Sequence, residues 1–247
     1  TVLSGYSAGD FVLLETGFDD VAFEYEMHQT LPTENRRVFR SYYEYDYGSD
    51  AAMLDALNAA LSETRRVWLV YWNVPPRLGA HLEAMGFARV QHTELPTGEN
   101  DPLYTQYPVI AVSLYARPAA DTTPRLFGEI FTLEDWHMAS VVPADAPRAL
   151  HVDLWWSALV PPERDYSAGV FLLDSAGVTR AEHIGPSRLT TTWGVGERVY
   201  DRHTLVLPPD LPAGDYTVIA NVYWWETVEP LLTDGQPYLT LGTVTIR

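Results

Sequence analysis

The second half of the chain is dominated by apolar and polar residues that alternate with a period of two. Between Arg148 and Trp225, runs such as ALHVDLWW and AGDYTVIANVYWW are separated by turns rich in proline and glycine. Because successive side chains of a strand point to opposite faces, this period predicts half-buried β-strands. Leu150, Val152, Leu154 and Trp156 share one face, and so do Tyr216, Val218, Ala220, Val222 and Trp224. Eight such runs, at 127–132, 136–142, 149–158, 166–173, 178–183, 199–207, 215–225 and 238–246, predict an antiparallel β-sandwich.

The first half of the chain alternates strand and helix patterns instead. Short apolar runs at 11–14, 38–42, 67–71 and 109–115 predict strands. Apolar stripes with helical spacing lie between them, at 18–25, after a cap at Ser49 or Asp50, and from Pro75 and Pro76 to Gly86. This order predicts a small sheet whose strands are joined by helical crossovers and are therefore mostly parallel.

We therefore predict an α+β chain with two domains. Residues 1–118 form a small α/β domain with a mostly parallel sheet, and the polar, proline-flanked stretch at 119–125 is a linker. Residues 126–247 form the antiparallel β-sandwich, of an immunoglobulin-like or carbohydrate-binding-module-like type.

The charge of the chain excludes several classes of partner. The net charge is −17, and all sixteen cationic side chains are arginine. Nucleic acid and anionic lipid surfaces would be repelled, so we predict no nucleic-acid partner and no docking on anionic lipid. The chain has no cysteine, no stretch of about 20 apolar residues, and no signal peptide at its start. No glycine-rich phosphate loop precedes the first predicted helix, and we predict no cofactor.

A set of anchor residues in the second half resembles a known pattern. The set is Trp193, Gly196, Glu197, Asp201, His203, Leu207, Pro208, Leu211, Pro212, Gly214, Tyr216 and Tyr223, with Trp156 and the hairpin at 172–177. Gly9-Asp10 and the run Arg66-Val67-Trp68-Leu69-Val70 extend the resemblance more loosely into the first half. The pattern is similar to the soluble C-terminal region of bacterial membrane glycosyltransferases of the family 39 type, relatives of protein mannosyltransferases and aminoarabinose transferases.

This resemblance implies a cellular location and a parent protein, but it implies no catalytic residues in this chain. In that family the reacting acids belong to the membrane portion, which uses a lipid-linked sugar as donor. The expectation is a non-catalytic domain on the extracytoplasmic side of a bacterial membrane, tethered to the membrane portion of its own parent protein. It is expected to help hold a polysaccharide or glycoprotein acceptor.

Aromatic residues beside carboxylates are the candidates for glycan binding, because flat rings stack on sugars and carboxylates accept hydrogen bonds from hydroxyls. The tyrosine-rich segment follows the strand at 38–42 and is expected at the carboxyl edge of the sheet, where open α/β folds bind ligands. In the Trp-Trp pairs of the second half, strand alternation turns one ring of each outward. The candidates are Tyr42, Tyr43, Glu44, Tyr45, Tyr47, Trp72, Asn73, Trp155 and Trp225. The alternative is that these rings pack as ordinary structural aromatics.

The sequence contains no close pair of histidines, and we predict no metal centre. A cation site is geometrically possible only if Asp201 and His203 on one strand meet His151 and Asp153 on its neighbour. Outward polar positions on a half-exposed sheet would explain these residues equally well.

Two other functions stay open from the sequence. The chain is alternatively a free-standing secreted carbohydrate-binding or adhesion module. A sugar or ester hydrolase is a third class, with Glu15, Asp19, Asp20 and Glu24 as acids that could flank a glycosidic bond. Acids at a helix start are more simply explained by the helix dipole, and no G-x-S-x-G elbow supports an esterase.

Overall fold

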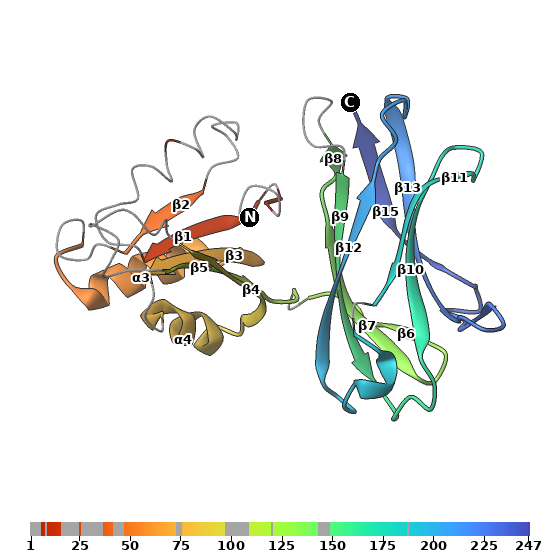
Figure 1. Ribbon diagram of the computed structural model, residues 1–247, viewed down its shortest axis with the longest axis horizontal. Coiled ribbons are helices and arrows are strands. Elements are labelled where there is room, and N and C mark those ends of the chain that lie inside the picture. Colours follow the sequence, from red (N-terminus) through yellow and green to blue (C-terminus); the bar gives the residue numbers. More distant parts are fainter. Residues whose placement is uncertain are drawn as a thin grey trace. The chain divides into compact units, whose positions relative to one another are not determined.

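The structure is a computed structural model that describes residues 6–7, 9–15, 25, 37–41, 47–72, 76–96, 109–119, 121–142, 149–186 and 188–247. The chain divides into two compact units, Thr1–Arg117 and Pro118–Arg247, called the first and second unit below (Figure 1). Strands contain more residues than helices in both units, so the β-rich character of the predicted fold is confirmed.

The first unit is built on a mixed five-stranded sheet. Its order is β2 (Val38–Arg40), β1 (Phe11–Glu15), β3 (Arg66–Trp72), β5 (Val109–Ala116) and β4 (Ala88–Pro96). Strand β1 runs parallel to β2 and β3, whereas β5 runs antiparallel to both β3 and β4. Strands β1, β2, β3 and β4 therefore share one direction, and only β5 of the described strands runs against them, because the chain returns beside β4 as β5.

Strand β4 has no counterpart among the predicted strands. It lies at the edge of the sheet, and a register shift between Arg89 and Gln91 interrupts its pairing with β5. Most of its side chains are exposed or only half-buried. Because apolar periodicity reports burial on one face, a strand with so little burial leaves almost no signal in the sequence.

Two helices of the first unit begin and end where the sequence predicts. Helix α3 (Asp50–Leu61) is capped by Ser49, whose hydroxyl accepts a hydrogen bond from the Ala52 amide at 3.2 Å. Helix α4 (Arg77–Ala84) is followed by Gly86 at φ +86°, a left-handed conformation that favours glycine. The predicted helix at 18–25 lies outside the described residues apart from Tyr25. No described helix has the length and apolar character needed to cross a bilayer.

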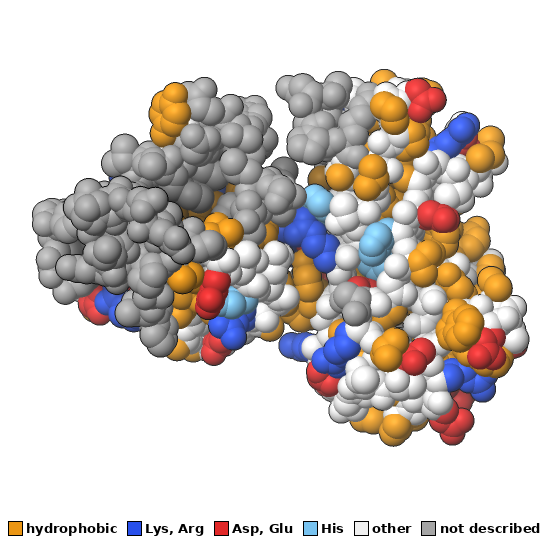
Figure 2. All heavy atoms as spheres, in the orientation of Figure 1, with side chains coloured by type: hydrophobic (Ala, Val, Ile, Leu, Met, Phe, Trp, Pro, Cys, Tyr) orange, Lys and Arg blue, Asp and Glu red, His pale blue; other side chains and the backbone are white. Residues whose placement is uncertain are grey.

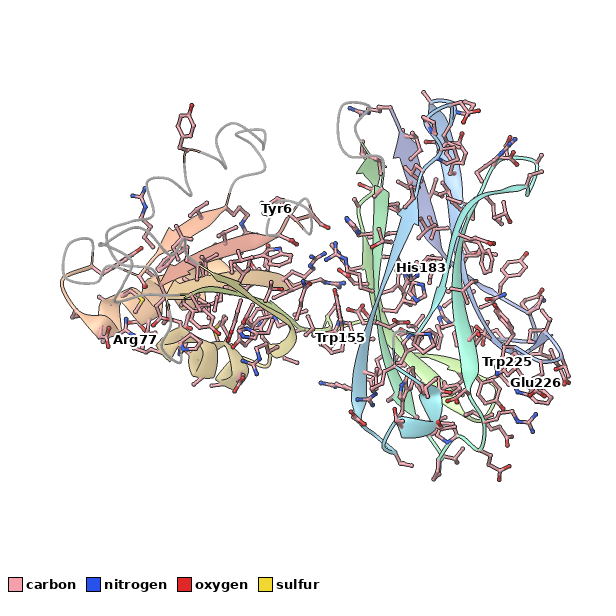
Figure 3. All side chains as sticks on the ribbon, in the orientation of Figure 1. Tyr6, Arg77, Trp155, His183, Trp225 and Glu226 are labelled. Atoms are coloured by element: carbon pink, nitrogen blue, oxygen red, sulfur yellow. The ribbon has the colours of Figure 1, made fainter. Side chains whose placement is uncertain are left out.

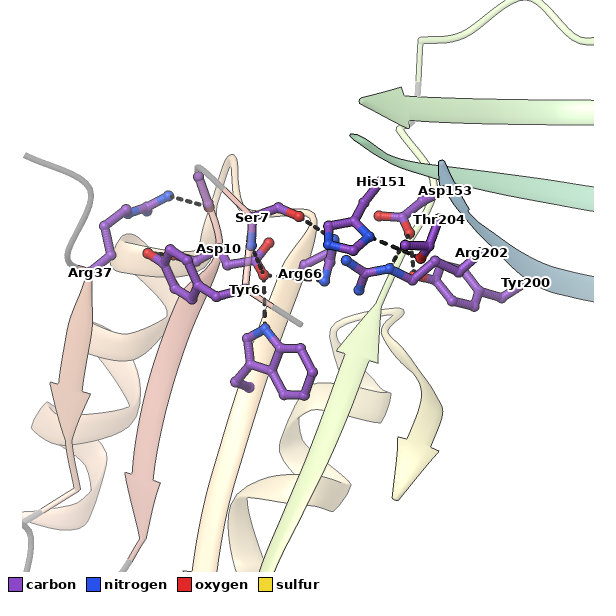
Figure 4. A network of polar contacts seen from close by, with 12 residues as sticks. Tyr6, Ser7, Asp10, Arg37, Arg66, His151, Asp153, Tyr200, Arg202 and Thr204 are labelled. Carbon is purple, nitrogen blue, oxygen red and sulfur yellow. Dashed lines mark hydrogen bonds and ion pairs between the residues drawn. The ribbon is translucent and has the colours of Figure 1, made fainter. Parts of the chain in front are cut away.

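A buried ion pair closes one end of this sheet. Asp10 is 1% exposed, and its carboxylate lies 3.2 Å from the Arg66 guanidinium and accepts a hydrogen bond from the Trp68 indole at 2.8 Å (Figure 4). These three residues belong to the sparse anchors noted in the first half of the sequence. Their spacing is therefore explained by a contact between the start of β1 and strand β3.

The second unit contains two sheets that share one core. A four-stranded sheet has the order β12 (Arg198–Val206), β9 (Ala149–Ala158), β7 (Phe131–Met138) and β6 (Arg125–Phe127). A six-stranded sheet has the order β11 (Thr179–Gly185), β10 (Tyr166–Leu173), β13 (Gly214–Trp224), β15 (Leu239–Ile246) and β8 (Val141–Val142), and β14 (Glu229–Pro230) pairs with β13. Neighbouring strands are antiparallel except β15 and β8. Figure 1 shows the two sheets face to face.

The core of the second unit confirms the predicted alternation. Leu150, Val152, Leu154 and Trp156 of β9 and Tyr216, Val218, Ala220 and Val222 of β13 all belong to one buried cluster. The predicted bounds of the first two strands, 127–132 and 136–142, were wrong, because a turn at Gly128 divides the first of them between β6 and β7. Part of the predicted linker is fastened to β7, since the Ala119 amide and the Thr122 hydroxyl both donate to the Asp135 carboxylate, at 2.7 and 2.6 Å.

Candidate functional site

Most of the tyrosine-rich segment, residues 42–47, lies outside the described residues. Tyr42, Tyr43, Glu44, Tyr45 and Asn73 lie outside the described residues, and Trp72 is the last residue of β3. Tyr47 is described, and its ring stacks on that of Phe39 with 5.3 Å between centroids. Both rings are partly buried against the core beneath α3, so Tyr47 has a structural contact on one side.

The two outward tryptophans of the second unit differ in exposure. Trp155 is only 5% exposed and packs its ring edge-on against Tyr200, with 5.2 Å between centroids. The Tyr200 hydroxyl donates to the Asp153 carboxylate at 2.5 Å (Figure 4). Trp225 is 59% exposed. Of these two rings, only that of Trp225 presents an open surface to a ligand.

The four candidate metal ligands do not converge. Strands β12 and β9 are neighbours, but Asp201 and His203 lie opposite Leu154 and Val152 on the core face. His151 and Asp153 lie opposite Thr204 and Arg202, on the other face of the same sheet. A shared cation site is therefore ruled out by the register, because opposed residues of an antiparallel pair point to the same side. Among the described residues, no group of three or more metal-ligating side chains could hold an ion.

Glu15, one of the acids considered for hydrolysis, has a structural partner. Its carboxylate accepts hydrogen bonds from the Arg77 and Leu78 amides, both at 3.2 Å, at the start of α4. Burial raises the pKa of Glu15, while these amides and the Arg77 guanidinium lower it. Asp19, Asp20 and Glu24 lie outside the described residues.

Trp225 lies in a turn that contains a residue with a strained backbone conformation, Val228. The turn joins β13 to β14, and the Val228 amide donates to the Trp224 carbonyl at 2.8 Å. Val228 has φ +57° and is 67% exposed. A β-branched residue is disfavoured in this left-handed region, at a cost of about 1–3 kcal/mol. Trp225 and Glu226 lie near each other at the surface (Figure 3).

A hollow adjoins this turn. It has a volume of about 480 Å³ and is lined by Ile130, Val160, Pro161, Pro162, Glu163, Arg164 and Tyr166. The Arg164 guanidinium lies 4.3 Å above the centre of the Trp224 ring. Tyr166 pairs with Trp224 across the strands, and Trp224 pairs with Glu229 on its other side. The hollow and the Trp225 turn therefore lie at the same end of the six-stranded sheet, with the hollow on the side of Trp224.

The loop that forms the hollow is held by hydrogen bonds to the following segment. The Asp165 carboxylate accepts from the Thr191 amide at 3.0 Å and from its hydroxyl at 2.8 Å. The Thr190 hydroxyl accepts from the Tyr166 amide at 2.8 Å. These bonds fix the backbone beside Arg164.

The end of the sheet combines the groups that recognise a neutral polyhydroxylated ligand. Trp225 provides an exposed indole face for stacking, and the carboxylate of Glu226, the next residue, accepts hydrogen bonds. Glu163 and Arg164 supply an acceptor and a donor in the hollow. Figure 2 shows hydrophobic and acidic side chains next to each other on the part of the surface where Figure 3 labels Trp225 and Glu226.

Sequence reasoning identified Trp225 but not its surroundings. Strand alternation is enough to separate Trp224 from Trp225. Arg164 lies 60 positions earlier in the chain, and only the pairing of β10 with β13 brings its loop to Trp224. The conformation of Val228 has no sequence signature, since valine rarely adopts positive φ.

Comparisons with known proteins give no family. No family model matches the chain, and no curated protein matches it. Among solved structures, the C-terminal domain of wzt aligns with TM-score 0.38 and 12% identity, over 53% of this chain and 82% of that one. A Niemann-Pick type C2 protein from the Japanese carpenter ant aligns with TM-score 0.33 and 12% identity, over 49% and 95%. An immunoglobulin-like protein from Pseudomonas aeruginosa aligns with TM-score 0.26 and 10% identity, over 52% and 100%. TM-scores and identities this low carry no argument about function.

Proposed function

We propose that this chain is a non-catalytic glycan-binding region whose site is the Trp225 turn and the adjoining hollow. The observation that carries the proposal is an exposed tryptophan held beside carboxylates on a turn with a strained Val228. Strain that does not serve stability is characteristic of binding sites. A ring of a neutral sugar stacks on Trp225, and its hydroxyls donate to Glu226.

In the larger protein, the region serves a membrane glycosyltransferase of the family 39 type. It is an α/β domain followed by a β-sandwich, on the extracytoplasmic side of a bacterial membrane, and it is tethered to the membrane portion of its parent. It holds the polysaccharide or glycoprotein acceptor while the membrane portion carries out the transfer. The support is the resemblance of the anchor residues in the second half of the sequence, together with a net charge of −17 that disfavours nucleic acid and anionic lipid as partners.

Oligosaccharide binding by the purified chain tests the site. A glycan array identifies the preferred sugar, and titration calorimetry then compares wild type with Trp225→Ala. Loss of the stacking surface is expected to weaken binding at least tenfold, which corresponds to about 1.4 kcal/mol. Tyr25→Ala is the matched control, because Tyr25 is also an exposed aromatic residue, 62% exposed, and lies in the first unit.

The possible results test the glycan-binding function, the position of the site and the membrane-bound parent protein separately. If no oligosaccharide binds, the glycan-binding function is wrong. If Trp225→Ala binds as tightly as wild type, the site is wrong, and the double variant Tyr43→Ala, Tyr45→Ala then tests the tyrosine-rich segment in its place. A parent gene without hydrophobic spans upstream of Thr1 would point to the free-standing secreted module instead.

A further inference from the structure

A polar cluster lies on one side of the second unit, where the edge strand of one sheet approaches the edge strand of the other. Strand β11 is the edge of the six-stranded sheet and β12 is the edge of the four-stranded sheet. The two strands lie close together but form no backbone ladder with each other. Their inward residues include His183 on β11 and Asp201 and His203 on β12. Figure 3 labels His183 between the two sheets.

The three side chains form a chain of short contacts. The Nε2 atom of His203 lies 2.8 Å from the Asp201 carboxylate, and both residues are buried, with side-chain exposures of 0% and 2%. The Nδ1 atom of His203 lies 3.1 Å from Nδ1 of His183 and 3.1 Å from the His183 carbonyl oxygen. His203 therefore joins the two strands through its Nδ1 atom.

The position of the protons follows from the partners. A carbonyl oxygen only accepts hydrogen bonds, so Nδ1 of His203 carries a proton and donates it to the His183 carbonyl. One further proton lies between Nε2 of His203 and the Asp201 carboxylate, because two bare lone pairs would repel at 2.8 Å. The His203–Asp201 pair is therefore neutral overall. The Nδ1 atom of His183 faces the donor and acts as an acceptor, which requires that His183 be neutral.

In the described parts of the neighbouring strands, no second acid faces the cluster to balance another positive charge. His183 pairs with Val170 of β10, while Asp201 and His203 pair with Leu154 and Val152 of β9. Gly185 completes the cluster, since a Cβ atom there would lie 3.1 Å from His203 and 3.3 Å from Asp201. Glu182 and Arg202 belong to the same two strands but alternate onto the opposite faces. Among the described residues of β9, β10, β11 and β12, Asp201 is thus the one acid facing His183 and His203.

We propose that His183, His203 and Asp201 form a proton-operated latch that joins the two sheets at neutral pH and releases strand β11 in acid. When His183 takes up a proton on Nδ1, two N–H groups face each other across 3.1 Å and the contact becomes repulsive. His183 is only partly buried, so protons reach it and its ring can turn toward solvent. The joint between β11 and β12 then loses its central side-chain contact.

The direction of the pH dependence follows from His183. Burial, and next the neighbouring His203, lower the pKa of His183 from its ordinary value of 6.5, and the Asp201 carboxylate partly opposes this shift. As the pH falls through 6.5, His183 binds a proton more readily in the released form of β11 than in the latched form. The latched form is therefore stable above this pH and loses stability as the pH falls toward the lowered pKa.

Hydrogen exchange of the intact chain tests the latch. Amide exchange is followed by mass spectrometry between pH 7.5 and 5.0, after correction for the intrinsic pH dependence of exchange. Peptides covering β11 are expected to lose protection at least tenfold on acidification, while those covering β13 keep theirs. His183→Gln cannot be protonated in this range, and its β11 protection is expected to be independent of pH. His92→Gln, a histidine of the first unit, is the matched control and is expected to behave as wild type.

Two results would overturn the latch. One is a wild-type β11 whose protection does not change between pH 7.5 and 5.0. The other is the same pH dependence in His183→Gln. If that variant does not fold, the histidine ring resonances of the wild type still decide the question by NMR, because a His183 that titrates above pH 6.5 contradicts the latch.

Discussion

At the scale of single residues, Val228 connects conformation to the proposed site. It combines φ +57° with 67% exposure, so neither burial nor tight packing accounts for its conformation. Its amide closes the turn that contains Trp225 and Glu226 by donating to the Trp224 carbonyl. The turn holds Val228 in this conformation at a cost in the stability of the fold.

Replacing Val228 with glycine is expected to stabilise the protein by about 1 kcal/mol, because glycine adopts positive φ without a Cβ penalty. The gain is measured as a rise in the urea midpoint of the second unit. Thr227→Gly is the control, since Thr227 shares the turn without positive φ, and it is expected to be neutral or destabilising. A Val228→Gly variant less stable than wild type would show that Val228 is not strained.

At the scale of elements, many anchors of the family resemblance hold structural contacts. Trp193 is 4% exposed in the core, and the Glu197 carboxylate accepts from the Gly194 amide at 2.8 Å. Asp201 and His203 form the latch pair, and the Tyr216 hydroxyl donates to the Pro212 carbonyl at 2.8 Å. These anchors therefore form contacts that stabilise the loops and the edge strands of the two sheets.

The Tyr216 hydrogen bond fastens the loop before β13 to the strand itself. Tyr216→Phe removes one partly buried hydrogen bond and is expected to cost about 1 kcal/mol in the free energy of unfolding. Tyr238→Phe removes a hydroxyl from a side chain that is 44% exposed and is expected to change stability little. The two variants are compared by urea denaturation. Equal stabilities would mean that the bond contributes nothing to the fold.

Elements with strong one-sided burial could be predicted from the sequence, and the others could not. Strands β9, β10 and β13 lie within one or two residues of their predicted bounds, because their inner faces are apolar throughout. Strand β6 has three residues and β4 is largely exposed, so neither has a measurable period. Trp225 could be selected from alternation, but the approach of Arg164 to Trp224 depends on long-range pairing.

At the scale of the whole molecule, the hydrophobic cores separate by unit. The large cluster of the second unit uses residues between 127 and 246, and the two clusters of the first unit use residues between 6 and 115. The first unit has one cluster on each face of its sheet. Each unit therefore has its own source of hydrophobic stabilisation.

Independent cores predict independent unfolding. Residues 118–247 produced alone are expected to fold, with a melting temperature within a few degrees of the matching transition of the full chain. Differential scanning calorimetry of the full chain is expected to resolve into two transitions. One cooperative transition, together with an unfolded 118–247 fragment, would contradict this prediction.

Strand β4 also affects how the protein behaves at high concentration. A long outer strand presents unpaired amides and carbonyls to which a second molecule could add its own strand, which is the first step of aggregation. The register shift after Arg89 breaks the regular spacing of those groups, and Pro96 removes a donor at the far end. The charge of Arg89 adds to this protection. The register shift, Pro96 and the Arg89 charge are features that disfavour the pairing of β4 with a strand of a second molecule.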